Sequence, residues 1–317
     1  MRPHAAAPAP AGDFSPLLNK VIAGIGRVIL GKDEVIRLAV TCLIARGHLL
    51  IEDLPGVGKT TLAHVLARAF GLRFQRIQVT SDMLPADILG VSVYDSDAGA
   101  FKFHPGPVFS QVVLADEVNR ATPKAQSALL EAMEEHQVTI EGETHTLPRP
   151  SFVIATQNPA HQIGTFPLPE SQLDRFLMRL HMGYPDRAAE RELLLGADRR
   201  ELLQQLPAAI STDDLIAIQS GVTMVHTSAA LIDYLQAILA HSRESPLCQN
   251  GLSPRAGLAL LRCAQASALM DGRGHALPED VQGVLPSVIG HRLQPAEGQS
   301  AHATAELVSQ LATVPIP

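Results

Sequence analysis

The stretch that decides the fold is HLLIEDLPGVGKTTLAHVLARAF, residues 48–70. It opens with a short apolar run, His48–Ile51, and closes with a helical pattern, Thr61–Phe70. Between them lies a glycine-rich loop, which at the start of a helix turns successive backbone N–H groups toward phosphate oxygens. The residues of this loop that we expect to hold a ligand are Pro55, Gly56, Val57, Gly58, Lys59, Thr60 and Thr61.

The loop predicts a nucleotide site of the P-loop type, with ATP and Mg²⁺ as cofactors. Lys59 would neutralise the β- and γ-phosphates, and the Thr60 hydroxyl would bind Mg²⁺. The pattern departs at its first position, where the full motif has glycine and this chain has Asp53. A glycine-rich turn without a ligand would explain the glycines, but not a Gly-Lys-Thr at the start of a helix.

Two carboxylates follow the apolar run Val112–Ala115 farther along the chain. In open α/β sheets, ligands bind in the crevice at the carboxyl ends of the strands. Asp116 therefore suits a Mg²⁺ contact, directly or through water, and Glu117 suits the polarisation of an attacking water. Two acids at a strand end also fit a solvated surface, an interpretation that the neighbouring P-loop disfavours.

A polar amide follows a third apolar run, Phe152–Ala155, in the sequence Thr156-Gln157-Asn158-Pro159. Asn158 at the tip of a core strand can hold the lytic water or contact the γ-phosphate. Because Asn-Pro also favours turn initiation, the residues alone leave both interpretations open.

The chain as a whole divides into an α/β part and a helical part. Apolar runs alternate with helical patterns from about residue 14 to 184, which predicts a parallel sheet covered by helices. Residues 185–292 carry only helical patterns, with Ser211 and Ser253 as expected N-caps and Pro254 and Pro278 in first turns. We expect a flexible tail at 1–13 and a loosely ordered tail at 293–317. The remaining strands are expected at Phe74–Val79 and Phe176–Met182, and the helices at Arg187–Leu195, Thr212–Val222, Ala229–Ser242, Pro254–Met270 and Pro278–Leu285.

Two inserted hairpins are also predicted. Val91–Tyr94 and Ala100–Phe103 are short alternating runs joined by a turn-rich link, and Gln137–Ile140 and Thr144–Leu147 flank Glu141-Gly142-Glu143 in the same way.

Composition limits the classes of function. The chain has 317 residues, 46% hydrophobic and 18% charged, as in an ordinary globular protein. A net charge of −7 disfavours nonspecific nucleic-acid binding. The three scattered cysteines favour neither a disulfide framework nor a zinc site and fit a reducing cytoplasm. No stretch approaches the roughly 18 apolar residues of a spanning helix, so we expect no membrane partner.

These motifs, in this order, resemble an AAA+ ATPase, and most closely the MoxR family. The likeness covers nearly the whole chain between residues 20 and 290. It rests on IEDLPGVGKTTL (51–62), the 103–135 stretch with HPGPVFSQVVLADEVNRATPKAQSALLEAMEE, ATQNP (155–159), FPLPESQLDRF (166–176) and SPRA (253–256). The fold implied is a P-loop AAA+ core, a parallel sheet sandwiched by helices, with a smaller all-helical lid domain.

The resemblance implies further roles. Asn158 would be sensor 1, Arg175 an arginine finger reaching a neighbouring subunit's nucleotide, and Arg255 a sensor-2 arginine, acting in cis or in trans. The resemblance implies a homo-oligomeric ring, expected to be a hexamer, that remodels a client protein, often one with a von Willebrand A-type domain. The inserted hairpins would face the pore or the substrate, unless they are merely solvated loops. One segment, Ala160-His161-Gln162-Ile163, departs from the family, whose members usually carry acidic residues there.

The function expected is Mg-dependent ATP hydrolysis by water attack on the γ-phosphate, with Glu117 orienting the water and Arg175 completing the site in trans. Phosphoryl transfer needs positioning and charge neutralisation more than covalent help. The alternatives are a chelatase-type metal-insertion motor, a nucleotide-gated scaffold with little turnover, and a motor driven by nucleic acid. Glu117 disfavours the scaffold, because binding alone needs no water-activating acid.

Overall fold

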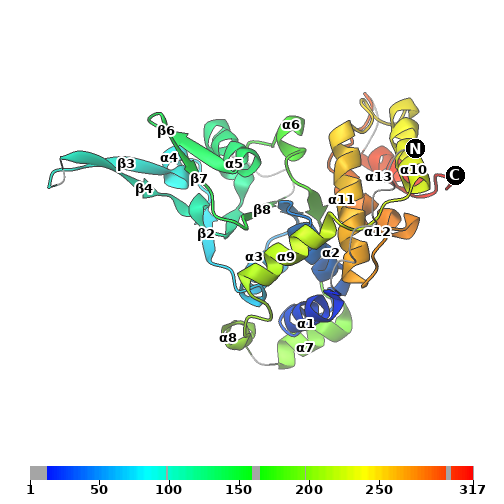
Figure 1. Cartoon of the computed structure of the whole chain (residues 1–317), viewed down its shortest axis with the longest axis horizontal. Coiled ribbons are helices and arrows are strands. Elements are labelled where there is room, and N and C mark those ends of the chain that lie inside the picture. Colours follow the sequence, from blue (N-terminus) through cyan, green and yellow to red (C-terminus); the bar gives the residue numbers. More distant parts are fainter. Residues whose placement is uncertain (1–12, 98, 159–164, 197, 298–300, 317) are drawn as a thin grey trace, which may run out of the picture. The chain divides into compact units, whose positions relative to one another are not determined.

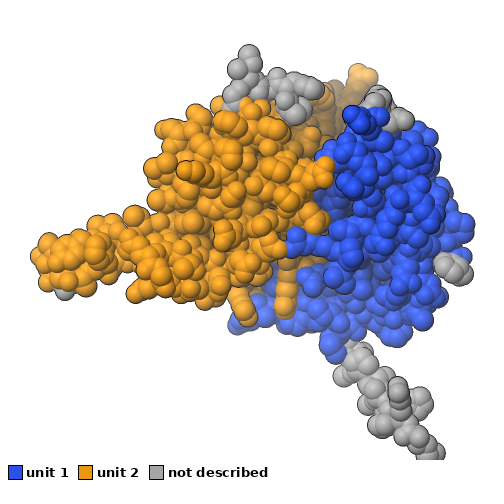
Figure 2. Space-filling view, turned by 90° about the horizontal axis from the view of Figure 1, so that it is seen from above, with its two compact units in different colours: residues 1–19, 213–317 blue, residues 20–212 orange. Residues whose placement is uncertain are grey.

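The computed structural model describes residues 13–97, 99–158, 165–196, 198–297 and 301–316 (Figure 1). The chain forms two compact units, which Figure 2 colours separately. The α/β unit comprises residues 20–212, and the helical unit comprises residues 1–19 and 213–317. The tail expected at 1–13 lies outside the described residues except for Asp13.

A five-stranded parallel sheet forms the centre of the α/β unit, in the order β2-β5-β8-β1-β9. This confirms the parallel sheet that the sequence predicts. The expected runs match the strands to within one or two residues at each end. The strands are β1 (Leu49–Glu52), β2 (Phe74–Gln78), β5 (Val112–Asp116), β8 (Phe152–Gln157) and β9 (Met178–Leu180).

The sheet is buried on both faces because its central strands are apolar at successive positions. Leu50, Val113 and Val153 pack into one hydrophobic cluster with residues of α4 (Pro85–Leu89) and α5 (Pro123–Glu135). Side chains alternate along a strand, so their neighbours point to the opposite face. On that side α2 (Asp33–Ile44) contacts β1 and β9, and α3 (Lys59–Ala69) contacts β2 and β5.

The α/β unit extends beyond the boundary that the sequence predicts, to residue 212 rather than 184. Arg68 on α3 donates to the carbonyl of Leu206 at 2.7 Å, and the N–H of Ala209 donates to the carbonyl of Ala69 at 2.8 Å. These bonds hold the segment after α8 against α3. The other helices of this part are α1 (Ser15–Gly26), which spans the division, α6 (Glu170–Leu173), α7 (Arg187–Leu195) and α8 (Arg199–Gln205).

Both predicted hairpins are present. β3 (Gly90–Asp95) pairs with β4 (Ala100–Pro105), and this hairpin extends away from the rest of the α/β unit (Figure 1). β6 (Gln137–Ile140) pairs with β7 (Glu143–Thr146). The His145 ring stacks on Phe103 with 4.0 Å between centroids, which joins the two hairpins.

The helical unit contains α9 (Thr212–Val222), α10 (Ala229–Glu244), α11 (Pro254–Met270) and α12 (Pro278–Ile289). Ser253 caps α11 as predicted, its side chain accepting from the N–H of Ala256 at 3.2 Å. The prediction of a loosely ordered tail after residue 292 is wrong for the segment that forms α13 (Ala301–Ala312). Leu307 and Leu311, four residues apart, are fully buried, and α13 contacts α10 and α12. Within the described residues no helix combines the length and apolarity needed to cross a membrane.

Candidate active site

A cavity of about 310 Å³ opens beside the carboxyl ends of the central strands. The parallel order of the sheet brings the ends of β1, β5 and β8 to one edge, and α3 begins beside them. This edge therefore collects three of the predicted motifs. The lining residues are Pro55, Gly56, Gly58, Lys59, Thr60, Thr61, Asp116, Glu117 and Asn158.

The phosphate-binding loop has the backbone that its glycines allow. Gly56 and Gly58 have φ angles of 88° and 96°, in the left-handed region where a side chain is strained. α3 begins directly after Gly58, at Lys59. The first N–H groups of a helix have no partner within it, so they are available to an anion at this end.

Lys59 reaches across the cavity from the start of α3. Its ammonium donates to the backbone carbonyl of Asp53 at 2.5 Å and to Asn158 Oδ1 at 2.9 Å. The side chain is buried, and this burial lowers the pKa of Lys59, although the carboxylates of Asp53, Asp116 and Glu117 oppose the effect. A cation with little hydration at this position interacts strongly with phosphate charge.

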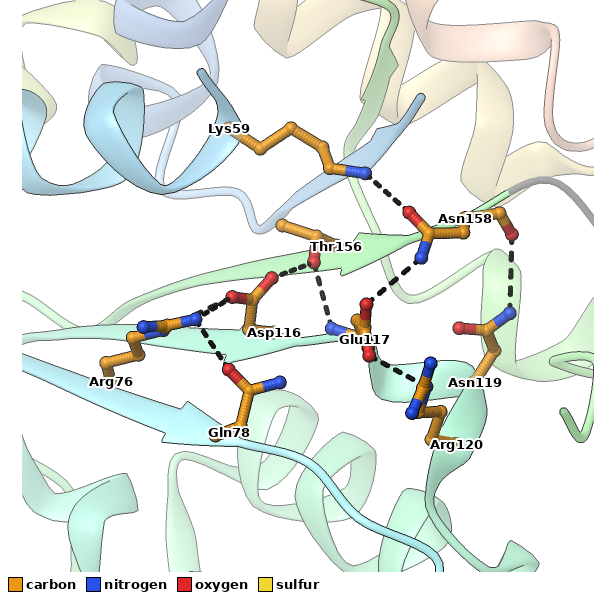
Figure 3. Close-up of polar contacts among 9 residues, drawn as sticks. All are labelled: Lys59, Arg76, Gln78, Asp116, Glu117, Asn119, Arg120, Thr156 and Asn158. Carbon is orange, nitrogen blue, oxygen red and sulfur yellow. Dashed lines mark hydrogen bonds and ion pairs between the residues drawn. The ribbon is translucent and has the colours of Figure 1, made fainter. Parts of the chain in front are cut away.

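Asp116 is held by residues of both neighbouring strands (Figure 3). Its Oδ1 accepts from the Thr156 hydroxyl at 2.6 Å, on β8. Its Oδ2 accepts from Arg76 Nη2 at 2.6 Å and Nε at 3.2 Å, on β2. Because β5 lies between these strands, side chains from both neighbours hold the Asp116 carboxylate in the lining of the cavity.

Glu117 follows β5 with a left-handed backbone, φ 61°. Its N–H donates to the Thr156 hydroxyl at 2.9 Å. One carboxylate oxygen, Oε1, accepts from Asn158 Nδ2 at 3.1 Å, and the other, Oε2, lies 2.7 Å from Arg120 Nε. A continuous set of polar contacts therefore runs from Lys59 through Asn158 to Glu117 (Figure 3).

Known proteins are similar to this chain in sequence and in fold. Residues 48–178 match the model of an ATPase family associated with various cellular activities (AAA), and residues 240–311 match the AAA lid domain. The chain is 39% identical to Chaperone MoxR1 of Mycobacterium tuberculosis, across 92% of this chain and 81% of the relative.

The chain belongs to the MoxR family of AAA+ ATPases.

Two further proteins are similar to this chain over nearly its whole length. YeaC of Bacillus subtilis, an uncharacterized protein, is 43% identical over 96% of this chain and 97% of its own length. A candidate ATPase from Cytophaga hutchinsonii has a solved structure that matches with a TM-score of 0.85 and 35% identity, covering 95% of each chain. This MoxR-family protein binds nucleotide and hydrolyses ATP, as the family and its structural neighbour indicate.

The other predicted site residues lie outside the cavity lining. Val57 is in the loop but does not line the cavity. Arg175 donates to the carbonyl of Leu130 at 2.7 Å and lies 3.0 Å from Glu134 Oε2. Arg255 is exposed near the start of α11, in the helical unit. The segment Ala160–Ile163, which departs from the MoxR family, lies outside the described residues.

Sequence reasoning missed three side chains that hold the acids of this MoxR-family site: Arg76, Arg120 and Thr156. Thr156 lies in ATQNP (155–159) and Arg120 in the 103–135 stretch. Because both are polar residues within these motifs, their contact with the acids could have been predicted. Arg76 carried no such signal, because its contact with Asp116 depends on β2 being the neighbour of β5.

Proposed function

We propose that this cavity binds Mg·ATP and that its residues carry the hydrolysis that the family performs. The observation that carries the proposal is the contact series Lys59–Asn158–Glu117 across the cavity. It joins a cation suited to phosphate, an amide suited to sensing it and a carboxylate suited to activating water. Pure nucleotide storage would not need the carboxylate, so the series favours an ATPase over a scaffold that scarcely turns over.

Phosphate binding falls to the loop and to Lys59. The N–H groups of residues 56–61 lie at the start of α3, where the helix dipole favours negative charge. Lys59 now donates to Asp53 and Asn158, and both acceptors are neutral oxygens. We infer that a γ-phosphate would replace them, because a charge-assisted contact to phosphate is about twice as strong as one to a neutral acceptor.

The residues also fit Mg²⁺. Thr60 and Asp116 both line the cavity, and their side chains offer the oxygen ligands that this cation prefers. Each Asp116 oxygen accepts from a neighbour, yet a carboxylate has about four lone-pair sites and can accept more. When bound, the ion would neutralise charge on the phosphates. Thr60 and Asp116 are the residues that would hold it.

Glu117 is the residue that orients and polarises the attacking water in this proposal. It lines the cavity at the end of β5, and its Oε1 is held by Asn158, the amide that also contacts Lys59. If Lys59 turns to a γ-phosphate, Asn158 loses its bond to that lysine. Asn158 thus connects the presence of phosphate to the oxygen of Glu117 that would take the water proton.

The partners belong to the same proposal. Arg175 lines no part of the described cavity, which supports a role toward a neighbouring subunit's nucleotide and hence a homo-oligomeric ring, as a hexamer. An arginine suits this role because its charged fork matches phosphate oxygens. We further propose that the ring is cytoplasmic and remodels or activates a client, such as a protein with a von Willebrand A-type domain. A relative carries the name Chaperone MoxR1.

The test is ATP binding by Lys59→Ala, measured by calorimetry with Mg²⁺ present. Loss of the main cation at the phosphates should abolish tight binding, while Lys20→Ala, which removes an exposed lysine of α1, should bind as the wild type does. Near-normal ATP affinity in Lys59→Ala would remove the assignment of this cavity as the nucleotide site.

A further inference from the structure

The turn after β5 carries Arg120, which does not line the cavity but contacts Glu117, an acid that does. Val118–Arg120 forms a 3₁₀ turn, and the N–H of Arg120 donates to the carbonyl of Glu117 at 2.8 Å. Residues three apart in a 3₁₀ turn lie one above the other. The turn therefore places the Arg120 guanidinium over Glu117, with Nε 2.7 Å from Oε2.

Burial and hydrogen bonds hold the backbone of this turn in place. Val118 and Asn119 are buried, at 0% and 4% exposure. Asn119 Nδ2 donates to the carbonyl of Asn158 at 3.3 Å, and the carbonyl of Asn119 accepts from the N–H of Phe166 at 2.6 Å. Because these two residues are buried and hydrogen-bonded, the turn has little freedom to shift. The backbone of Arg120, its third residue, is therefore held in position.

The two oxygens of Glu117 have different neighbours. Oε1 is bonded to Asn158, which lines the cavity, and Oε2 is bonded to Arg120, which does not. Figure 3 shows Arg120 and Asn158 on different oxygens of the Glu117 carboxylate. A donor on the far oxygen fixes the direction of a carboxylate without covering the near one. Arg120 is therefore placed to orient Glu117, not to touch nucleotide in its own cavity.

Charge balance supports the same role. Asp116 and Glu117 are adjacent acids, and like charges at this range repel. Asp116 already has a cation in Arg76, at 2.6 Å. Arg120 supplies the corresponding cation for Glu117; the Glu117 side chain is 24% exposed and the Arg120 side chain 49%.

We propose that Arg120 is a positioning residue for ATP hydrolysis, which holds the far oxygen of Glu117 so that the near oxygen faces the attacking water. This inference rests on the proposed function, because it assumes that Glu117 is the water-activating acid. A carboxylate that is free to rotate would spend less time in the reactive geometry, and small misplacements of a catalytic group cost rate steeply.

The test compares steady-state ATP hydrolysis by Arg120→Ala, Arg120→Lys and a control, Lys124→Ala. Lys124 is an exposed cation four residues farther along, so its loss matches the change of charge. Arg120→Ala should lower kcat on the order of tenfold or more, with KM for ATP within about twofold. Arg120→Lys should recover part of the loss, because an ammonium still offers one donor to Oε2. Lys124→Ala should match the wild type.

A further comparison separates positioning from a general structural role. In a Glu117→Gln background, measured by single-turnover hydrolysis, adding Arg120→Ala should cause little further loss, because the acid that Arg120 positions is already gone. Unchanged or raised kcat in Arg120→Ala, or a full tenfold loss in the Glu117→Gln background, would overturn the inference. If Glu117→Gln itself turns over normally, the proposed function fails instead. Thermal unfolding of each variant reports whether it folds.

Discussion

The carboxylate of Asp53 accepts a hydrogen bond from the backbone N–H of Gly183 at 2.6 Å, joining the start of the phosphate-binding loop to the segment that follows β9. Its other oxygen accepts from the N–H of Leu54 at 2.7 Å. Burial alone would raise the pKa of Asp53, but these N–H donors and that of Met182 outweigh it and hold the pKa below its ordinary value. Asp53, which replaces the first glycine of the general P-loop motif, thus ties the loop to the segment after β9.

Replacing this anchor should cost stability. Asp53→Gly restores the glycine of the general motif but removes two charge-assisted hydrogen bonds and loosens the unfolded chain. We expect a loss of about 1–3 kcal/mol in the free energy of unfolding, measured with urea at pH 7. Asp53→Asn, which can still accept a bond from Gly183, should lose less. Equal stability of wild type and Asp53→Gly would show that the bond to Gly183 contributes nothing.

A buried histidine should make the α/β unit sensitive to mild acid. His48 Nδ1 accepts from the N–H of Val153 at 3.0 Å, and Nε2 lies 3.2 Å from the carbonyl of Met133, so the neutral ring is satisfied on both sides. Burial lowers the pKa of His48 to about 4 from an ordinary 6.5. The unfolded chain therefore binds a proton that the folded chain does not between these pH values.

The contribution of neutral His48 to the free energy of unfolding is therefore complete above pH 6.5. It is lost as the pH falls toward 4, by up to about 3 kcal/mol. Urea unfolding at pH 7.5 and 5 should show a smaller difference in His48→Gln than in the wild type. His104→Gln, at an exposed position on β4, should keep the wild-type difference. Parallel pH curves for wild type and His48→Gln would contradict this account.

The individual strands were predictable from sequence, and so were the cavity residues. Buried parallel strands have near-continuous apolar runs, and polar residues directly after such runs stand out. Asp116, Glu117 and Asn158 were found in this way and Lys59 from the glycine-rich loop at the start of a helix, and the structure places all four around one cavity. Only the role of each stays a prediction.

The contacts that could not be predicted from the sequence are those that depend on which strands are neighbours in the sheet. Asp116 meets Thr156 and Arg76 because β5 lies between β8 and β2, and one sequence does not contain that order. The same holds for the unit boundary. α7 and α8 have helical patterns like those of the lid, but bonds such as Arg68 to Leu206 assign this region to the α/β unit. α13 was missed because its apolar pattern is short and follows a proline- and glycine-containing stretch.

If the protein forms the proposed ring, with Arg175 completing a neighbour's site, two inactive variants should complement each other. Arg175→Ala should bind ATP almost normally yet be nearly inactive, because arginine fingers contribute about 10³ to 10⁵ in rate where they act. Lys59→Ala should be inactive because its own cavity binds no ATP, although its Arg175 is intact. Mixing the two variants and letting subunits exchange should restore part of the ATPase activity, at a level set by the ratio.

Two results would decide against this arrangement. Mixed rings that demonstrably form but show no activity at any ratio would mean that Arg175 does not complete a neighbour's site. Full activity of Arg175→Ala alone would mean that its contacts with Leu130 and Glu134 are its whole role.

The central claim is that the carboxylate of Glu117 drives hydrolysis in the cavity that Lys59 and Asn158 share. Glu117→Gln tests it most directly, because the amide keeps the shape and the bond from Asn158 can persist, while the negative charge is lost. ATP binding by calorimetry and turnover by phosphate release should be measured on the same preparation. We predict ATP and Mg²⁺ affinity close to that of the wild type, with turnover nearly abolished. Turnover within about threefold of the wild type, a loss of roughly 0.7 kcal/mol, would contradict the account and leave Glu117 with a structural role.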